Sequence, residues 1–342
     1  HSLNYTIFPS ESAFHCGPPE KPVAASINLP RIANYDPNPY SFCHFMTQTP
    51  EIDSILTTTE AYLTNDLLPF WMEHAPDSEC GGFLTYIDAT GKRTGETTKT
   101  FLMQIRTLYT MASAHRAGYG QGQCAELAAM GAQFILDHYW DEQHGGWFWI
   151  ADQKGNITNA NKIGYGQCFA VYAFSEYTLA TGDDRGREAA VRTYDTIFRH
   201  MFDGRNEGFI ELFQKDWTPL PGGSSGGDRK SFDVHMHMME AFTTLYEMTQ
   251  KVEHRGQLNK IIDLILSRML HPKTGLGTAQ FTKDYIPLPA INFDTTWGRD
   301  AEPEEGREEK PLDQTSTGHN TEFAWLLLHA ADILGTPRKT YA

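Results

Sequence analysis

Two short stretches of this sequence carry imidazole and carboxylate groups at spacings that suit proton transfer. His319 stands at the expected start of an amphipathic helix, and Glu322 follows it by one helical turn on nearly the same face. A carboxylate at this spacing can hold an imidazole tautomer and raise its basicity, which is how a general base is built. The same two residues could instead form a polar helix start in which Glu322 compensates the helix dipole.

The second stretch, residues 231–241, contains two histidines. Asp233 and His237 are four residues apart and share a helix face, so they can act together on a ligand. His235 and His237 are two residues apart and point to opposite sides of a helix, so they cannot chelate one ion together. We therefore expect no metal and no other cofactor. The alternative is that His237 is only a hydrogen-bonded core histidine.

Two further candidates lie earlier in the chain. Arg106 is placed on an otherwise apolar helix, so its guanidinium must be paired or must face a cavity. Tyr165, in the segment K-I-G-Y-G-Q, is a candidate substrate contact, although most tyrosines in a ring of helices serve packing.

The elements that position these residues form a repeat. Gly81-Gly82-Phe83 with Lys99 and Gln104 recurs about 64 residues later as Gly145-Gly146-Trp147 with Lys162 and Gln167, and further copies begin near residues 207 and 275. Such self-similarity indicates one supersecondary unit used several times. We predict an all-α ring of four hairpins, with short strands at the turns and helices at 52–72, 99–117, 121–140, 162–181, 185–202, 231–251, 255–270 and 319–334.

The repeat also predicts where the candidate residues meet. Each lies near the start of the second helix of its own repeat: Arg106, Tyr165, Asp233 with His237, and His319. Equivalent positions in a ring of hairpins face the same end of one axis. We therefore expect these side chains to converge in a single cleft.

The amino-acid composition restricts the kinds of binding partner that we expect for this protein. Acidic residues outnumber basic ones by 43 to 28 in the 342-residue chain, and no dense basic run is present, which disfavours a nucleic-acid partner. The five cysteines are scattered and lack C-x-x-C spacing, and no export signal or membrane span is recognisable, so we expect a cytoplasmic protein with no membrane partner. Residues 1–50, rich in proline, serine and asparagine, are expected to form an irregular arm before one domain at 51–342.

The motifs together resemble the N-acylglucosamine 2-epimerase family, and in particular its cellobiose 2-epimerase and mannose isomerase branches. The resemblance rests on four segments: G-H-N-T-E-F-A-W-L-L at 318–327, F-D-V-H-M-H-M-M-E-A-F-T at 232–243, K-x-x-x-x-Q-x-R at 99–106 and K-I-G-Y-G-Q at 162–167. It implies an (α/α)6 barrel and proton transfer at C2 of a reducing-end sugar through an enediolate.

Carried over residue by residue, the resemblance implies that His319 is a catalytic base supported by Glu322. His237 would contact the sugar near the site of ring opening, and Arg106 would stabilise the enediolate. Tyr165 and Asp233 would contact the substrate, with Asp233 in place of the asparagine usual in the family.

The length departs from the family pattern. Four repeats from residue 51 account for the sequence, so about two of six hairpins are expected to be absent, together with the family's second catalytic histidine. We would then expect self-association through an unclosed helical edge, and either no turnover or isomerisation alone. A glycoside hydrolase on the same scaffold, using two carboxylates such as Asp233 and Glu322, and a non-catalytic sugar-binding remnant are the alternatives.

Overall fold

The computed structural model describes residues 49–291 and 315–341, and most of them are helical. The chain divides into two units, His1–Pro69 and Phe70–Ala342. In the first, the described residues form α2 (Thr49–Tyr62) and the π-helical turn η1 (Leu63–Leu67), after which α3 (Leu68–His74) begins. The predicted irregular arm of residues 1–50 lies outside the described residues except for its last two, which belong to α2.

The second unit contains seven further α-helices among its described residues. Six of them form three consecutive hairpins, and the last stands after the undescribed stretch 292–314. Their bounds are α4 Phe101–Arg116, α5 Gln123–His138, α6 Gly164–Thr181, α7 Asp184–His200, α8 Phe232–Thr249, α9 Val252–Leu264 and α10 Thr317–Leu334. The π-helical turn η4 (Ile265–Met269) prolongs α9, and short 3-10 turns are η2 (Gly120–Gly122), η3 (Gly223–Ser225) and η5 (Arg338–Thr340).

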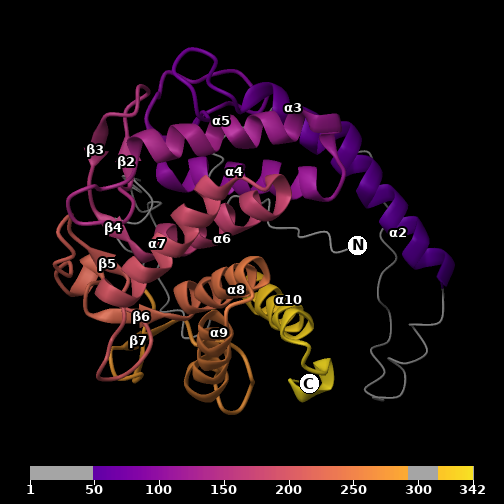
Figure 1. Ribbon diagram of the computed structural model, residues 1–342. Coiled ribbons are helices and arrows are strands. Elements are labelled where there is room, and N and C mark those ends of the chain that lie inside the picture. The colour runs from indigo at the N-terminus through magenta and orange to yellow at the C-terminus, as the bar shows by residue number, and fades with distance from the viewer. Residues whose placement is uncertain (1–48, 292–314, 342) are drawn as a thin grey trace, which may run out of the picture. The chain divides into compact units, whose positions relative to one another are not determined.

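The helices form two layers. The inner helices α4, α6, α8 and α10 pack side by side in that order, and α5, α7 and α9 pack on α4, α6 and α8 respectively (Figure 1). Between the layers lies one continuous core rich in aromatic side chains. α6 is buried almost all round, as a helix must be when it is covered by neighbours on several sides.

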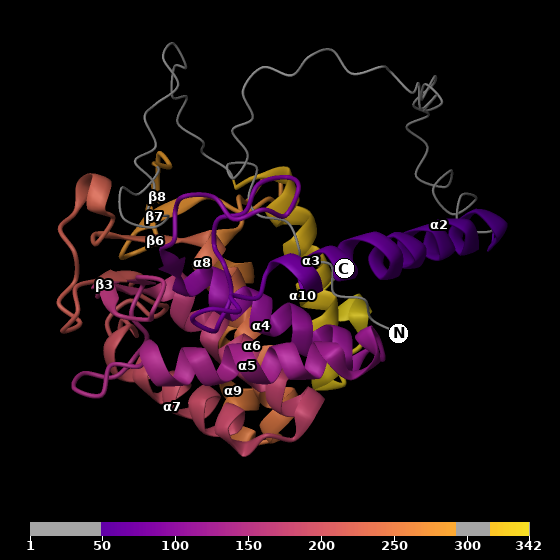
Figure 2. The ribbon, with the colours of Figure 1, turned by 90° about the horizontal axis from the view of Figure 1, so that it is seen from above.

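Short antiparallel strands connect successive repeats at one end of the helices (Figure 1). The strand just before an inner helix pairs with a strand from the following repeat. β1 (Lys99–Thr100) pairs with β2 (Ile150–Ala151), which also pairs with β3 (Ile157–Asn159). β4 (Lys162–Ile163) pairs with β5 (Leu212–Phe213), and β6 (Arg229–Ser231), β7 (Gln280–Thr282) and β8 (Pro287–Leu288) form the third sheet beside the start of α8 (Figure 2).

The same tight turn precedes each inner helix in all four copies of the repeat. Four residues share the first position of this turn, and each donates its backbone N–H to the carbonyl five residues later: Asp77, Asp141, Asp203 and His271. Glycine is required in the turn at Gly146, where φ is +77° and a Cβ would lie 2.4 Å from the Trp217 ring. The Trp217 indole closes over this turn by donating to the His144 carbonyl at 3.0 Å.

In three of the four repeats, a buried lysine forms an ion pair with the aspartate that begins the turn. Nζ of Lys162 lies 3.0 Å from Oδ2 of Asp141 and donates to the Gly146 carbonyl, and neither side chain is more than 3% exposed. Lys99 with Asp77 and Lys230 with Asp203 repeat this ion pair at 2.9 and 3.0 Å. Since a buried charge without a partner is costly, lysine and aspartate must occur together.

The fourth repeat replaces both charges at once. His271 stands at the aspartate position and Thr315 at the lysine position, and the backbone N–H of Thr315 donates to the Gly277 carbonyl at 2.9 Å. Because both charges are absent, neither is left buried and unpaired.

A second polar clamp lies five residues after the lysine position. Oε1 of Gln104 accepts the N–H of Phe83, and Oε1 of Gln167 accepts that of Trp147 at 3.0 Å. In the third repeat Nε2 of His235 accepts the N–H of Phe209 at 3.0 Å. In the fourth repeat Oδ1 of Asn320 accepts the N–H of Gly277 at 2.8 Å. Each inner helix is thereby fixed in rotation relative to the turn that precedes it.

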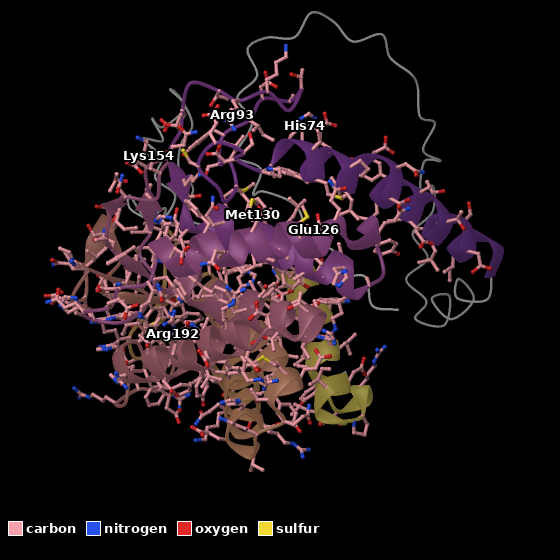
Figure 3. All side chains as sticks on the ribbon, turned by 45° about the horizontal axis from the view of Figure 1, so that its top comes forward. His74, Arg93, Glu126, Met130, Lys154 and Arg192 are labelled. Atoms are coloured by element: carbon pink, nitrogen blue, oxygen red, sulfur yellow. The ribbon has the colours of Figure 1, made fainter. Side chains whose placement is uncertain are left out.

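The predicted helices agree with the structure within three residues at every end when the π-helical turns η1 and η4 are counted with the helices that they adjoin, and the short strands lie at the predicted turns. Exposed charged side chains, such as Arg93, Glu126 and Lys154, stand on the loops and on α5 (Figure 3). Among the described residues, no helix is both long and apolar enough to cross a lipid bilayer.

The buried ion pair between Lys162 and Asp141 leads to a testable prediction about stability. Lys162→Met leaves the Asp141 carboxylate buried without its cation, so we expect a loss of about 3 to 5 kcal/mol in the free energy of unfolding. Urea unfolding followed by circular dichroism measures the change.

The matched control is the double variant Asp141→His with Lys162→Thr, which copies the fourth repeat. We expect it to recover a large part of the loss, because no buried charge is left alone. If the double variant is as unstable as the sum of the two single changes, the pair is not the unit that holds the turn.

Candidate active site

Five of the six candidate residues occupy two sets of equivalent positions on the inner helices, and His319, four residues after the lysine position of its repeat, is the exception. Seven residues after the lysine position of each repeat stand Arg106, Phe169, His237 and Glu322. Three residues after it, in the second and third repeats, stand Tyr165 and Asp233. Because the clamps fix the rotation of each helix, these positions face one another at the end of the helices where the turns lie.

His237 has a carboxylate on each side of its ring. Its Nδ1 lies 2.9 Å from Oε2 of Glu240, and its Nε2 lies 3.4 Å from Oδ1 of Asp233. The side chain is 3% exposed. Burial alone lowers the pKa of His237, but the two carboxylates outweigh burial and raise the pKa to about 10. The imidazole is therefore a cation at neutral pH.

Asp233 lies between two histidines that come from different helices. Its Oδ1 is 3.4 Å from Nε2 of His237 on α8 and 3.5 Å from Nε2 of His319 on α10. Both distances are those of ion pairs rather than of close hydrogen bonds. Burial raises the pKa of this carboxyl, but His237, His319 and Arg106 outweigh burial, so the pKa is lowered overall.

His319 lies in the first turn of α10, as predicted. Ser316 caps this helix by accepting the backbone N–H of His319 at 3.1 Å. The ring nitrogen Nδ1 is 3.2 Å from Oγ1 of Thr315, and the side chain is 38% exposed. His319 is thus oriented by its neighbours and still open to a ligand.

Glu322 does not support the His319 ring in the way the spacing predicts. Within the described part of the chain, the ring nitrogens of His319 contact Thr315 and Asp233, while Oε1 of Glu322 is buried with no hydrogen-bond partner. Burial is the main reason why the pKa of Glu322 is raised. A buried carboxyl oxygen of this kind is suited to receive a hydrogen bond from a ligand hydroxyl.

Arg106 and Tyr165 form the opposite side of the group. Nη1 of Arg106 donates to the Tyr165 hydroxyl at 3.3 Å, and that hydroxyl is 3.4 Å from Nε2 of His237. The guanidinium also lies over the Phe169 ring, with Cζ 4.9 Å from its centroid. Burial raises the pKa of Tyr165, so its hydroxyl keeps its proton.

His235 faces away from the group, as its spacing predicts. Its Nδ1 donates to the Ser231 carbonyl at 2.7 Å while its Nε2 accepts the N–H of Phe209, and burial lowers its pKa to about 4. His235 is therefore a neutral structural residue. In the described ranges, no cluster of three or more histidine, cysteine, aspartate or glutamate side chains could hold a metal ion.

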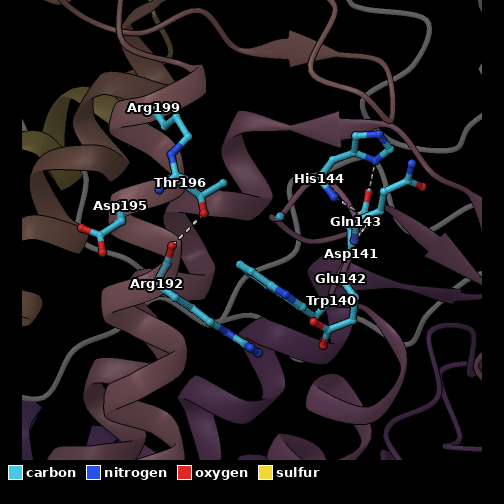
Figure 4. Close-up of a pocket in the computed structure, with 10 residues that line it drawn as sticks. Trp140, Asp141, Glu142, Gln143, His144, Arg192, Asp195, Thr196 and Arg199 are labelled. Carbon is cyan, nitrogen blue, oxygen red and sulfur yellow. Dashed lines mark hydrogen bonds and ion pairs between the residues drawn. The ribbon is translucent and has the colours of Figure 1, made fainter.

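A surface pocket of about 330 Å³ lies elsewhere, between the turn after α5 and the outer helix α7 (Figure 4). Its lining includes Trp140, His144, Arg192 and Arg199. Arg192 is stacked on the Trp140 ring, with Cζ 4.0 Å from the centroid. None of the six predicted site residues lines this pocket.

Sequence reasoning missed three residues that contact the histidine rings, namely Glu240, Thr315 and Phe169. Glu240 follows His237 by three residues, the spacing that drew attention to Glu322, and this signal was available in the sequence. Thr315 precedes α10 and has no such signal, since the fold brings its hydroxyl to the His319 ring. Phe169 could have been found by aligning the four repeats.

Three of the inner helices belong to consecutive hairpins, and the polar group at one end of the inner helices contains two histidines. Comparison with known proteins gives the family. Residues 81–341 match the N-acylglucosamine 2-epimerase (GlcNAc 2-epimerase) family, so the chain belongs to this family. It is 30% identical over 277 residues to a cellobiose 2-epimerase from Bacteroides fragilis, a match that covers 80% of this chain and 64% of that protein.

Other relatives agree with this assignment. A mannose-6-phosphate isomerase of Rhizobium meliloti is 28% identical over 277 residues, covering 80% of this chain and 63% of that protein. The solved structure of cellobiose 2-epimerase from Spirochaeta thermophila DSM 6192 matches with a TM-score of 0.71 at 25% identity, covering 86% of this chain and 68% of that one. The fold thus resembles the (α/α)6 barrels of this family, and the chain spans 64% of the length of the Bacteroides fragilis enzyme.

The raised pKa of His237 predicts how stability depends on pH. The folded protein binds this proton more tightly than the unfolded chain, so the contribution is complete below pH about 6.5 and is lost as pH rises through about 10. We expect the difference in free energy of unfolding between wild type and His237→Gln to shrink across that range. Denaturant titrations at pH 6, 8 and 10 test this, and a difference that does not change with pH would contradict it.

Proposed function

We propose that this chain carries the catalytic site of a sugar 2-epimerase or aldose–ketose isomerase that removes the C2 proton of a reducing-end sugar. The observation that carries the proposal is the meeting of His319, His237 and Arg106 around Asp233 and Tyr165. This group combines a half-exposed imidazole, a buried imidazolium and a guanidinium. Membership of the family supports the same reaction class.

His319 is the base in this proposal. It is the imidazole with the greater access to a ligand, and its 3.5 Å distance to the Asp233 carboxylate stabilises the cation formed when it takes a proton. The C2 proton of a sugar is weakly acidic, so removal becomes fast only when the new negative charge on oxygen is stabilised at the same time.

Arg106 supplies that stabilisation. Its guanidinium keeps its charge under all working conditions, and the contact with Tyr165 and the stacking on Phe169 restrict its motion. A positive charge fixed in place before the reaction costs no reorganisation when the enediolate forms.

His237 acts as the acid. Its ring holds a proton at neutral pH because of Glu240 and Asp233, and its Nε2 lies 3.4 Å from Oδ1 of Asp233. Such a group can protonate the ring oxygen of a closed sugar or the carbonyl oxygen of an open one. Oε1 of Glu322, buried and lacking a partner, is placed to accept a sugar hydroxyl.

One observation favours glycosidic hydrolysis as the alternative. The pKa of Glu322 is raised by burial, whereas the pKa of Asp233 is lowered by its cationic neighbours. Two carboxyl groups whose pKa values are driven apart suit an acid and a base. Two histidines on either side of Asp233 suit proton transfer at carbon better, so hydrolysis is the second candidate.

The test is to incubate the protein with mannose, glucose and cellobiose in heavy water. We expect an epimer or ketose product that carries solvent deuterium at C2 or C1, and no release of glucose from cellobiose. Nuclear magnetic resonance of the sugars identifies both outcomes. Glucose release from cellobiose without deuterium in the remaining sugar would favour the hydrolase, and binding without turnover would favour a sugar-binding protein.

Substitution tests the roles. His319→Gln removes the base and should lower kcat by about 100-fold to 10,000-fold. The control is His144→Gln, a histidine of the outer pocket, which should leave kcat unchanged. Equal activity in His319→Gln and wild type would remove His319 from the mechanism.

The proposal includes no metal. We expect turnover to survive dialysis against EDTA, because the ring nitrogens of His237 and His319 are directed at carboxylate and hydroxyl oxygens of the protein. Loss of turnover that zinc or manganese restores would show that a metal takes part.

A further inference from the structure

Asp233 is a carboxylate that forms an ion pair with both histidines. Its Oδ1 lies 3.4 Å from Nε2 of His237 and 3.5 Å from Nε2 of His319, and this oxygen is buried although the side chain as a whole is partly exposed. The two imidazoles come from different inner helices, α8 and α10, which pack against each other. One buried anion therefore serves two groups that can each carry a positive charge.

We propose that Asp233 is a positioning residue that couples the two histidines, so that a proton arriving on His319 favours the departure of a proton from His237. The proposal rests on the proposed function, in which His319 is the base and His237 the acid. It adds a third role, that of the anion between them, and it does not make Asp233 a group that reacts.

The charges around the pair explain why the anion is shared. Facing His237 are the Glu240 carboxylate on α8, the Tyr165 hydroxyl on α6 and, beyond that hydroxyl, the Arg106 guanidinium on α4. Glu322 faces the pair from α10, and its pKa is raised by burial and by the neighbouring carboxylates. With His237 protonated, the cations His237 and Arg106 balance the anions Asp233 and Glu240.

A second positive charge on His319 changes this balance. His319 then competes with His237 for the same oxygen of Asp233, and two imidazolium groups on one carboxylate repel each other. A positive charge on one ring therefore disfavours a positive charge on the other. Of the two histidines, Glu240 contacts His237, and within the described residues it forms no ion pair with His319, so it stabilises one member of the pair without joining the competition.

In the reaction the coupling moves protons in a balanced way. The C2–H bond breaks, its proton goes to Nε2 of His319, and its electron pair becomes the C1–C2 double bond. The π pair of the C1 carbonyl moves to its oxygen, where Arg106 stabilises the negative charge until that oxygen takes the proton that Nε2 of His237 gives up, and the intermediate is then a neutral enediol. His319 becomes the cation, His237 becomes neutral, and Asp233 remains the counter-ion of whichever ring is charged.

The test needs no substrate, so it is independent of turnover. Histidine signals of the full chain, labelled with ¹³C and ¹⁵N, are followed from pH 4 to 11 and assigned with His237→Gln and His319→Gln. We expect His237→Gln to raise the titration midpoint of His319, and Asp233→Asn to lower it, each by about one pH unit. Opposite signs distinguish a shared anion from a general change in the fold.

Glu240→Gln is the matched control, since it removes the other carboxylate of His237. It should lower the midpoint of His237 as Asp233→Asn does, but should leave that of His319 within a few tenths of a unit. Asp233→Asn is isosteric at a partly exposed side chain, so its result stands even where His237→Gln fails to fold.

A midpoint of His319 that is the same in wild type and in Asp233→Asn overturns the proposal. If the midpoints shift as expected and no sugar is converted, the coupling stands and the proposed function fails. If sugars are converted, the acid limb of the pH dependence of kcat/KM should move to lower pH in Asp233→Asn and stay in place in Glu240→Gln.

Discussion

The buried ion pair between a lysine and the first residue of the preceding turn is the interaction on which the arrangement of this protein depends. Lys162 and Asp141 illustrate it: the lysine lies in the strand that leads into an inner helix, and the aspartate opens the turn that ends the previous outer helix. The pair joins the two helices of one repeat at their ends. Because the amide or imidazole five residues later binds the same turn, the inner helix can neither slide nor rotate.

Because the inner helices are held in this way, the geometry of the candidate site is fixed. Once the register of each inner helix is set, the residues three and seven positions after the lysine are directed to a common space. The residue five positions after the lysine binds the turn in all four repeats and the lysine does so in three, whereas the residues three and seven positions after the lysine differ from repeat to repeat. The repeat thus separates the part of the sequence that folds from the part that is free to carry function.

Much of this was predictable from the sequence because it is periodic. The helices, the turns and the convergence of Arg106, Tyr165, Asp233, His237 and His319 follow from repeated motifs and helical spacing. The partners of the rings were harder to predict. Spacing places Glu322 near His319 as well as Glu240 near His237, yet only Glu240 contacts its histidine, because the choice depends on side-chain rotamers and on what neighbouring helices offer.

Asp233 shows the same limit. Its contact with His237 is local and follows from helical spacing, while its contact with His319 joins residues 86 positions apart and depends on how α8 packs against α10. No sequence pattern within α8 or α10 specifies the distance between Asp233 and His319. The register of the repeats predicts that the two helices present their first turns to the same space, but not that one oxygen lies between two nitrogens.

Phe169 is the apolar residue among the four equivalent positions of the candidate site. It occupies the position that holds Arg106, His237 and Glu322 in the other repeats, and it carries no charge. The Arg106 guanidinium lies over its ring, and the centroids of the Phe169 and His237 rings are 4.9 Å apart, so one apolar side chain contacts both cations. The aromatic face attracts the guanidinium, while the apolar ring adds to the burial that by itself lowers the pKa of His237. The aromatic ring adds burial but no charge, so the proton of the neighbouring imidazole is held by Glu240 and Asp233, which outweigh that burial.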